Sequence, residues 1–153
     1  MNLEWLIVGG GIHGVHLAAR LIGQGEVDPK SLRIIDPCDR LLERWLACTE
    51  VTGMRFLRSP SVHNLDLDPW SLKEFAGHRK KKKRVGLFAR PYSRPALSLF
   101  NAHCQRVIEE FALADLHVQA RAESCTIADG TIDVCLSSGD TMRTRNVVLA
   151  IGS

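Results

Sequence analysis

Four glycines fall within eight residues near the start of the chain, in the segment IVGGGIHG at positions 7–14. Glycine costs about 0.5–1 kcal/mol relative to alanine inside regular structure, so a cluster of this density needs a local reason. The apolar run EWLIV precedes it, as expected of a buried strand, and from Ile12 apolar residues recur at helical spacing to about Ile22. The pattern therefore predicts a strand, a tight glycine turn and a helix.

A second apolar run, LRIID at positions 32–36, follows a turn-rich linker and ends in a carboxylate. Strand, glycine turn, helix and strand form a βαβ unit, which is right-handed in nearly all proteins. Gly9, Gly11 and Gly14 spell G-x-G-x-x-G, and Asp36 lies close to the usual interval of about 20 residues beyond them. This context favours a dinucleotide fingerprint over a glycine-rich turn that serves packing alone.

Each residue of the fingerprint has a physical task. Gly9 permits the tight turn, Gly11 lets the backbone approach a diphosphate, and Gly14 lets the helix lie close to the sheet. The helix N-terminus offers unpaired N–H groups and partial positive charge to phosphates. The Asp36 carboxylate can accept hydrogen bonds from ribose hydroxyls, which favours a ribose without a 2′-phosphate, as in FAD or NAD.

The remaining pattern predicts helices, loops and strands in turn. A short helix is expected within positions 38–47, ordered loop and short helix across 52–95, and a long amphipathic helix over 96–113. Apolar residues then alternate over 118–123 and 132–137, with hairpin turns at Asp129-Gly130 and Gly139-Asp140. The last run, NVVLAIGS, predicts a strand ending at Gly152. We therefore expect a parallel α/β sheet covered by a β-meander.

Composition excludes several other classes of protein. The chain has 153 residues, of which 45% are hydrophobic, enough for one globular domain. No apolar stretch approaches the roughly 20 residues of a membrane span, and the N-terminus does not resemble a signal peptide. Five cysteines without close spacing argue against a disulfide framework or a metal site and predict a reducing cytoplasm.

A basic loop at positions 78–84, HRKKKKR, raises the alternative of nucleic-acid binding. Surfaces that bind nucleic acid usually spread basic residues over an element and mix them with aromatic side chains. This run is isolated, which favours a solvated loop tip.

The order of elements resembles the FAD domain of the two-dinucleotide-binding flavoproteins. In that family a strand ending in Ala-Thr-Gly closes the FAD domain, and Ala150, Ile151 and Gly152 stand in the same place here. The resemblance covers essentially the whole chain. It implies a Rossmann-like FAD/NAD(P)-binding fold over residues 1–153, as the N-terminal part of a larger flavoprotein architecture.

A narrower resemblance is to the flavin-dependent lysine and ornithine N-hydroxylases. The matching features are Met54, Phe56-Leu57, Pro60, Pro69-x-Ser71 and Arg94. Those enzymes usually carry Lys-Asp where this chain has Arg58-Ser59, so the resemblance implies the architecture and a place beside the flavin rather than an amine substrate. Arg55, Arg58 and His63 are candidates near the flavin ring, and each is also compatible with a purely structural loop residue.

The leading prediction is FAD binding as part of a flavin-dependent oxidoreductase or monooxygenase; the alternative is a non-catalytic NAD(P)-binding or sensing module. The chain carries one nucleotide fingerprint and stops just after the expected closing strand, so we expect it to lack the NAD(P)H domain needed for turnover. No catalytic residue is assigned, and the substrate and the oligomeric state stay open. The candidate cofactor-binding residues are Gly9, Gly10, Gly11, Ile12, His13, Gly14, Asp36, Pro37, Arg58 and Gly152.

Overall fold

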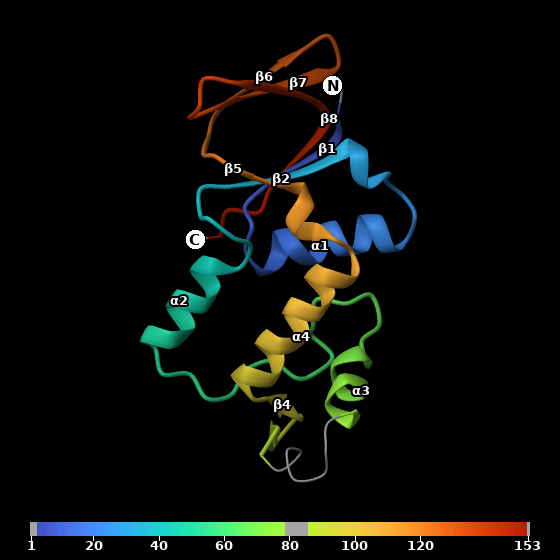
Figure 1. The fold of residues 1–153 in the computed structure, drawn as a ribbon, viewed down its shortest axis with the longest axis vertical. Coiled ribbons are helices and arrows are strands. Elements are labelled where there is room, and N and C mark those ends of the chain that lie inside the picture. Colours follow the sequence, from blue (N-terminus) through green and yellow to red (C-terminus); the bar gives the residue numbers. More distant parts are fainter. Residues whose placement is uncertain (1–2, 79–85, 153) are drawn as a thin grey trace.

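The computed structural model describes residues 3–78 and 86–152, which form a mixed α/β fold. Its main sheet has six strands in the order β5-β2-β1-β8-β7-β6 (Figure 1). The strands are β1 (Leu3–Val8), β2 (Leu32–Asp36), β5 (His117–Gln119), β6 (Ala122–Ala128), β7 (Thr131–Leu136) and β8 (Thr141–Leu149). Most of the positively charged loop predicted at 78–84 lies outside the described residues.

The parallel half of the sheet is centred on β1. It pairs with β2 on one side and β8 on the other, and β5 pairs with β2 beyond. Val8 lies opposite both Ile35 and Leu149, so the three central strands end at one edge. The predicted parallel sheet is confirmed, and its carboxyl edge is where open α/β sheets bind ligands.

The meander is built on the long strand β8. Its first part pairs antiparallel with β7 and its last part pairs parallel with β1, so β6 and β7 curl over one face of the parallel strands. Val134 and Leu136 of β7 pack there against Leu6 and Ile35. The predicted covering meander is confirmed, and β8 begins earlier and ends earlier than the expected closing strand.

The predicted strand over 118–123 is wrong as a single element. It divides into β5 and β6, which pair with different partners. The Ala120 N–H donates to the Asp36 carbonyl at 3.1 Å, whereas Arg121 exchanges hydrogen bonds with Ser137. The chain therefore leaves the parallel strands between Ala120 and Arg121 and enters the meander.

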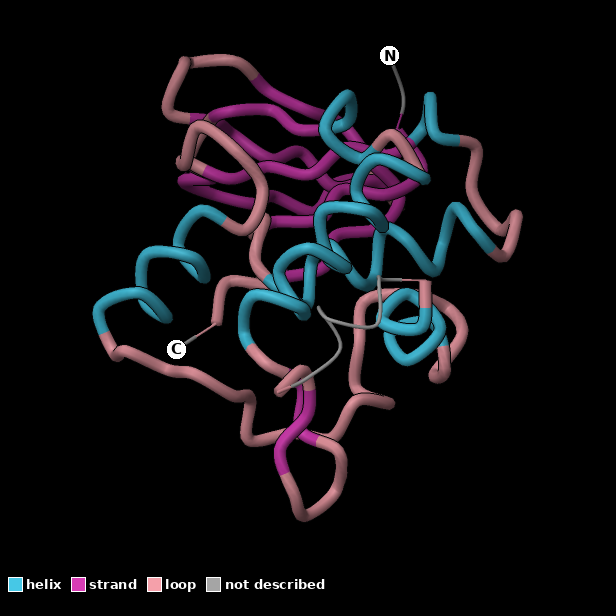
Figure 2. The backbone as a smooth tube through the Cα atoms, turned by 60° about the horizontal axis from the view of Figure 1, so that its bottom comes forward, coloured by secondary structure: helices cyan, strands magenta, loops and turns pink. Residues whose placement is uncertain are grey.

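Helices cover the opposite face of the sheet, as Figure 2 shows. Helix α1 (Ile12–Gly23) and helix α4 (Leu97–Glu110) enclose the larger core cluster with Ile7 and Ile34. The periodicity of α4 is confirmed, because its apolar stripes are buried. No helix among residues 3–78 and 86–152 combines the length and the apolar character needed to cross a membrane.

The region between β2 and α4 is mostly irregular. Helix α2 (Glu43–Val51) starts later than predicted because Leu42 adopts a left-handed backbone with φ of 63°. Helix α3 (Ser71–Gly77) confirms the short helix expected within 52–95, and the two-residue strands β3 (Phe88–Ala89) and β4 (Arg94–Pro95) also lie in that segment. Short 3-10 turns at Pro29–Ser31 and Leu113–Leu116 lead into β2 and β5.

Candidate functional site

The glycine turn joins β1 to α1 at the carboxyl edge of the sheet. Gly9 has φ of 117°, and a Cβ there would overlap the Ala150 carbonyl, while a Cβ on Gly14 would overlap the Gly9 carbonyl oxygen. A Cβ on Gly11 would meet nothing within 4 Å. Two glycines therefore permit close packing of the backbone, whereas Gly11 faces open space.

Asp36 fastens this turn to the end of β2. Its Oδ2 accepts a hydrogen bond from the Gly10 N–H at 2.6 Å, and its Oδ1 accepts one from the Cys38 N–H at 2.9 Å. Each carboxylate oxygen can accept a further bond, because an ionised carboxylate has about four acceptor positions. Asp36 can therefore hold the turn and still receive hydroxyl groups from a ligand.

A cavity of about 720 Å³ opens in front of the turn. Its walls come from the carboxyl edge of the sheet, the start of α1, helices α2 and α4 and the loop after α2. The lining residues are Val8, Gly9, Gly11, Ile12, His13, Ile35, Asp36, Pro37, Cys38, Arg44, Trp45, Leu57, Ser59, His63, Phe100, Ala120, Arg121, Ala122, Ala150, Ile151 and Gly152. This volume lies within the roughly 300–1,000 Å³ common for small-molecule sites.

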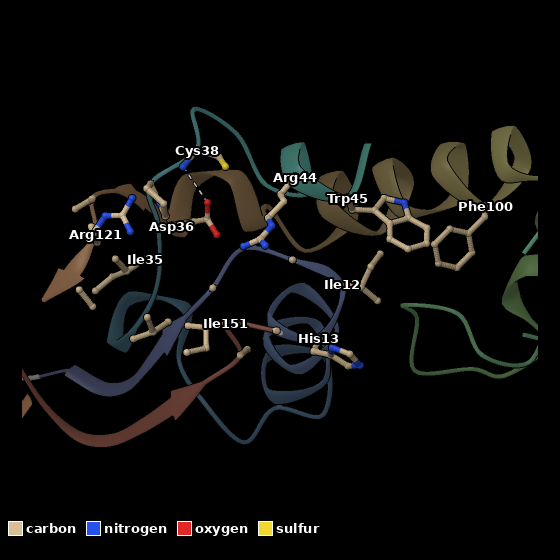
Figure 3. Close-up of a pocket in the computed structure, with 18 of the residues that line it drawn as sticks. Ile12, His13, Ile35, Asp36, Cys38, Arg44, Trp45, Phe100, Arg121 and Ile151 are labelled. Carbon is tan, nitrogen blue, oxygen red and sulfur yellow. Dashed lines mark hydrogen bonds between the residues drawn. The ribbon is translucent and has the colours of Figure 1, made fainter. Parts of the chain in front are cut away.

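The two ends of the cavity differ in chemistry. Figure 3 shows Asp36 and Arg121 at one end, Trp45 and Phe100 at the other, and Arg44 between them. The Trp45 and Phe100 rings meet edge to face, with centroids 5.8 Å apart. The Trp45 Nε1–H donates to Asn101 Oδ1 at 3.0 Å, which fixes the indole as an aromatic wall.

Positive charge is available along the cavity. Within the described part of the chain, the side chains of Arg44 and Arg121 form no ion pair or hydrogen bond. The hydrogen bond between Cys38 and Asp36, together with partial burial, raises the pKa of the Cys38 thiol, so this cysteine is protonated at neutral pH. The cavity therefore presents two free guanidinium groups and no thiolate.

Most of the residues predicted from sequence come together here. Seven of the candidates line the cavity: Gly9, Gly11, Ile12, His13, Asp36, Pro37 and Gly152. Gly10 and Gly14 lie in the turn behind the lining, and the candidate His63 also reaches the wall. Arg58 is exposed and does not line the cavity, although its neighbours Leu57 and Ser59 do; Arg55 is also outside the lining.

Sequence reasoning missed four prominent lining residues, Arg44, Trp45, Phe100 and Arg121. Phe100 follows the apolar period of α4, so it was indistinguishable from a core residue. Arg44, Trp45 and Arg121 lie in no recognisable sequence motif. Arg44 and Trp45 follow Asp36 closely in the sequence, and residues soon after the second strand lie near the carboxyl edge of the sheet. This short separation was the only signal in the sequence.

A separate polar cluster joins the loop before α3 to helix α4. The Asp66 Oδ2 accepts hydrogen bonds from Ser71 and from Arg106, the latter at 2.9 Å, and Ser71 Oγ lies 2.8 Å from His103 Nε2. His103 is fully buried, and burial with the nearby Arg106 charge lowers its pKa to about 4. The imidazole is therefore neutral at pH 7 and joins the loop to α4.

The model of the FAD-NAD(P)-binding family matches residues 6–153, which is nearly the whole sequence. The chain belongs to this family. The match includes both the glycine turn and the end of β8, the two elements that meet at the cavity. No curated protein sequence matches the chain.

Solved structures show the same fold in redox enzymes at low sequence identity. Cyclohexanone monooxygenase from Rhodococcus sp. Phi1, bound to NADP+, aligns with a TM-score of 0.68 at 13% identity over 99% of this chain and 26% of that one. A steroid monooxygenase bound to NADP gives 0.67 at 17% identity, with the same coverage of 99% and 26%. The bacillithiol disulfide reductase Bdr of Staphylococcus aureus gives 0.58 at 15% identity, over 99% of this chain and 39% of that one.

This FAD-NAD(P)-binding chain therefore spans between about a quarter and two fifths of the length of those three proteins. The likeness establishes the predicted Rossmann-like dinucleotide-binding fold.

Proposed function

We propose that this FAD-NAD(P)-binding domain holds FAD in an extended conformation along the larger cavity. The observation that carries the proposal is the order of groups along one cavity: an acceptor for ribose, an open glycine turn and an aromatic wall. FAD needs all three in that order, because it joins an adenosine to a planar flavin through a diphosphate. When bound, the flavin supplies the redox chemistry, and the protein supplies binding and electrostatics.

In this arrangement the two ends of FAD contact different kinds of side chain. Asp36 accepts hydrogen bonds from the ribose hydroxyls, using the acceptor positions left free by Gly10 and Cys38. The diphosphate lies at Gly11, beside the N-terminus of α1, with the Arg44 guanidinium as counter-charge. Trp45 and Phe100 contact the flavin end, and Arg121 lies at the adenosine end.

FAD is favoured over NAD(P) as the resident cofactor. Asp36 stands where a 2′-phosphate would be repelled, which disfavours NADP. The same fold occurs in OTEMO with FAD bound, at 14% identity and a TM-score of 0.63 over 98% of this chain, and in the two NADP-bound monooxygenases above, so the choice rests on the cavity. Two aromatic rings at the far end suit a flavin, which is larger and more apolar than a nicotinamide.

We assign residues 1–153 to the FAD domain of a flavin-dependent oxidoreductase or monooxygenase. One fingerprint accounts for one dinucleotide, so the site for a nicotinamide reductant belongs to other residues than these. The five cysteines are free thiols in the structure, which supports a reducing compartment such as the cytoplasm.

The test is a titration of the purified protein with FAD, followed by flavin absorption and fluorescence, with NAD as competitor. Arg44 is exposed, and within the described part of the chain its side chain forms no hydrogen bond or ion pair, so Arg44→Gln tests binding without unfolding. We expect the FAD dissociation constant to rise about tenfold or more in this variant, because a charged partner of the diphosphate is lost. Asp115→Asn, at an exposed site in the 3-10 turn before β5 and outside the cavity lining, is the control and leaves the constant unchanged.

Asp36→Ala removes the ribose acceptor and should abolish retention of FAD. Circular dichroism separates loss of binding from loss of the glycine turn. A protein that takes up NAD but no FAD would contradict the proposal and favour the nucleotide-sensing alternative.

A further inference from the structure

A second, smaller cavity of about 450 Å³ lies beside the first. It is lined by one face of α1, by the loop between α2 and α3 and by Phe100 of α4. The lining residues are Ile12, His13, His16, Arg20, Val62, His63, Asn64, Leu65, Asp66, Leu67, Pro69 and Phe100. Ile12, His13, His63 and Phe100 also line the larger cavity, so the two hollows share a wall.

Three nitrogen-bearing side chains on one face of α1 line this smaller cavity. His13, His16 and Arg20 are spaced three and four residues apart, which places them in one row along the helix. His16 Nδ1 lies 3.0 Å from the Leu65 carbonyl oxygen. Because a carbonyl only accepts, Nδ1 carries the proton, and Nε2 of the neutral ring can accept a hydrogen bond.

Arg20 is the unused cation of the cavity. Its side chain has neither an ion pair nor a hydrogen bond to any residue within 3–78 or 86–152. Half-buried guanidinium groups prefer a planar, bidentate anion such as a carboxylate. Arg20 is therefore available to an anionic ligand.

The acidic residue in the same wall does not oppose an anion. Asp66 accepts hydrogen bonds from Ser71, Arg106 and its neighbour Leu67 N–H. Burial alone would raise the pKa of Asp66, but these hydrogen bonds and the Arg106 charge hold it below the usual value. Its negative charge is thus compensated by Arg106 of α4.

The rest of the lining is apolar. Six of the twelve wall residues carry hydrocarbon or aromatic side chains: Ile12, Val62, Leu65, Leu67, Pro69 and Phe100. Such a wall favours a ligand with an apolar body, and an inorganic anion would leave it uncovered.

We propose that the smaller cavity binds a small organic carboxylate. The carboxylate pairs with the Arg20 guanidinium, and the apolar body packs against Leu65, Leu67 and Phe100. Its shared wall brings this ligand next to the aromatic end of the larger cavity. If FAD lies there as proposed above, the carboxylate is bound beside the flavin, in the place of a compound on which the flavin acts.

Isothermal titration with benzoate tests this site, and benzamide serves as the neutral probe of the same shape. We expect saturable binding of benzoate, weaker binding of benzamide, and a loss of benzoate affinity of about 10- to 100-fold in Arg20→Gln. Arg145→Gln removes the same charge from the exposed part of β8 and leaves the affinity unchanged. Equal binding of benzoate to Arg20→Gln and wild type, or no saturable binding at all, would overturn the proposal.

The same samples are titrated with FAD, which keeps this inference separable from the proposed cofactor. Arg20 does not line the larger cavity, so Arg20→Gln binds FAD as wild type does. Benzoate binding without FAD binding would remove the proposed cofactor and leave the carboxylate site. FAD binding without benzoate binding would remove the proposed carboxylate site and leave the proposed cofactor. Where both bind, benzoate should shift the flavin absorption bands, and an unchanged spectrum would contradict the shared wall.

Discussion

The two ends of the larger cavity are held in place by different kinds of interaction. At the Asp36 end, backbone meets backbone: the Gly9 N–H donates to the Ile35 carbonyl at 2.8 Å, and the Ala150 N–H donates to the Val8 carbonyl at 2.7 Å. At the aromatic end, side chains from separate elements meet, with Trp45 on α2 and Phe100 on α4. The first end is held by backbone hydrogen bonds together with the Asp36 carboxylate, and the second by contacts between particular side chains.

The difference predicts where the molecule tolerates change. A backbone junction without room for a Cβ cannot adjust to a substitution, whereas a side-chain wall can repack at moderate cost. We call the Asp36 end, with its glycine turn, the glycine end. We therefore expect substitutions at the glycine end to cause large losses of stability or binding, and substitutions at the aromatic end to cause smaller ones.

The largest effect is expected for Gly14→Ala. The new Cβ would overlap the Gly9 carbonyl oxygen, which is backbone and cannot move aside without opening the turn. The free energy of unfolding should fall by about 3 kcal/mol or more, as measured by urea denaturation. A stability equal to wild type would contradict the close packing described here.

Gly11→Ala is the matched variant at the same end. Its Cβ points into open space and its φ is negative at −78°, so the fold should keep its stability within about 0.5 kcal/mol. The methyl group occupies the approach to the glycine turn, so FAD binding should be lost. Unimpaired FAD binding by this folded variant would place the diphosphate elsewhere.

A fall in pH acts behind the aromatic end, through His103. The unfolded His103 side chain binds a proton near pH 6.5, whereas the folded one does so near pH 4. Between these values the unfolded state holds more protons, so stability decreases as the pH falls. At 1.36 kcal/mol per pH unit, we expect a loss of about 3 kcal/mol between pH 6.5 and 4.

The control for this pH effect is His103→Gln, which lacks the titrating imidazole. Its stability should fall less steeply than that of wild type over the same range, whatever its absolute stability. The Asp66 contribution lies lower, because its pKa is held below the usual 3.8 and its stabilisation is lost only as the pH falls through that lowered value. If the free energy of unfolding decreased equally steeply with falling pH in wild type and His103→Gln, His103 would not be the cause.

The smallest effect is expected for Trp45→Phe. The ring contact with Phe100 can persist, and only the hydrogen bond from Nε1 to Asn101 is lost. The free energy of unfolding should decrease by about 1 kcal/mol, with FAD still bound. Thermal melts of the apo and FAD-loaded protein measure both quantities. A loss of stability as large as that expected for Gly14→Ala would contradict the difference between the two ends.

The sequence predicted the glycine end well because its signals are local. The glycine spacing, the apolar run before it and the acid after the second strand together specify one βαβ unit. Helix α4 was equally visible, since its buried residues follow one period.

The aromatic end could not be read in the same way. Trp45 and Phe100 are far apart in the sequence, and their contact depends on how α2 and α4 pack, which periodicity does not encode. The break between β5 and β6 was hidden for a related reason. The alternation continues across Ala120 and Arg121, and only the change of hydrogen-bond partner divides the strand.

The most direct test of the central claim is an NMR titration of the ¹⁵N-labelled protein with FAD. If the cofactor spans the cavity, the amide signals of Gly11 and Ile12 and the indole Nε1–H of Trp45 should shift together, with one dissociation constant. The signals of β6, which lies outside the cavity lining beyond Ala122, should stay in place. Shifts confined to surfaces away from the glycine turn, with Gly11 and Trp45 unmoved, would contradict the account.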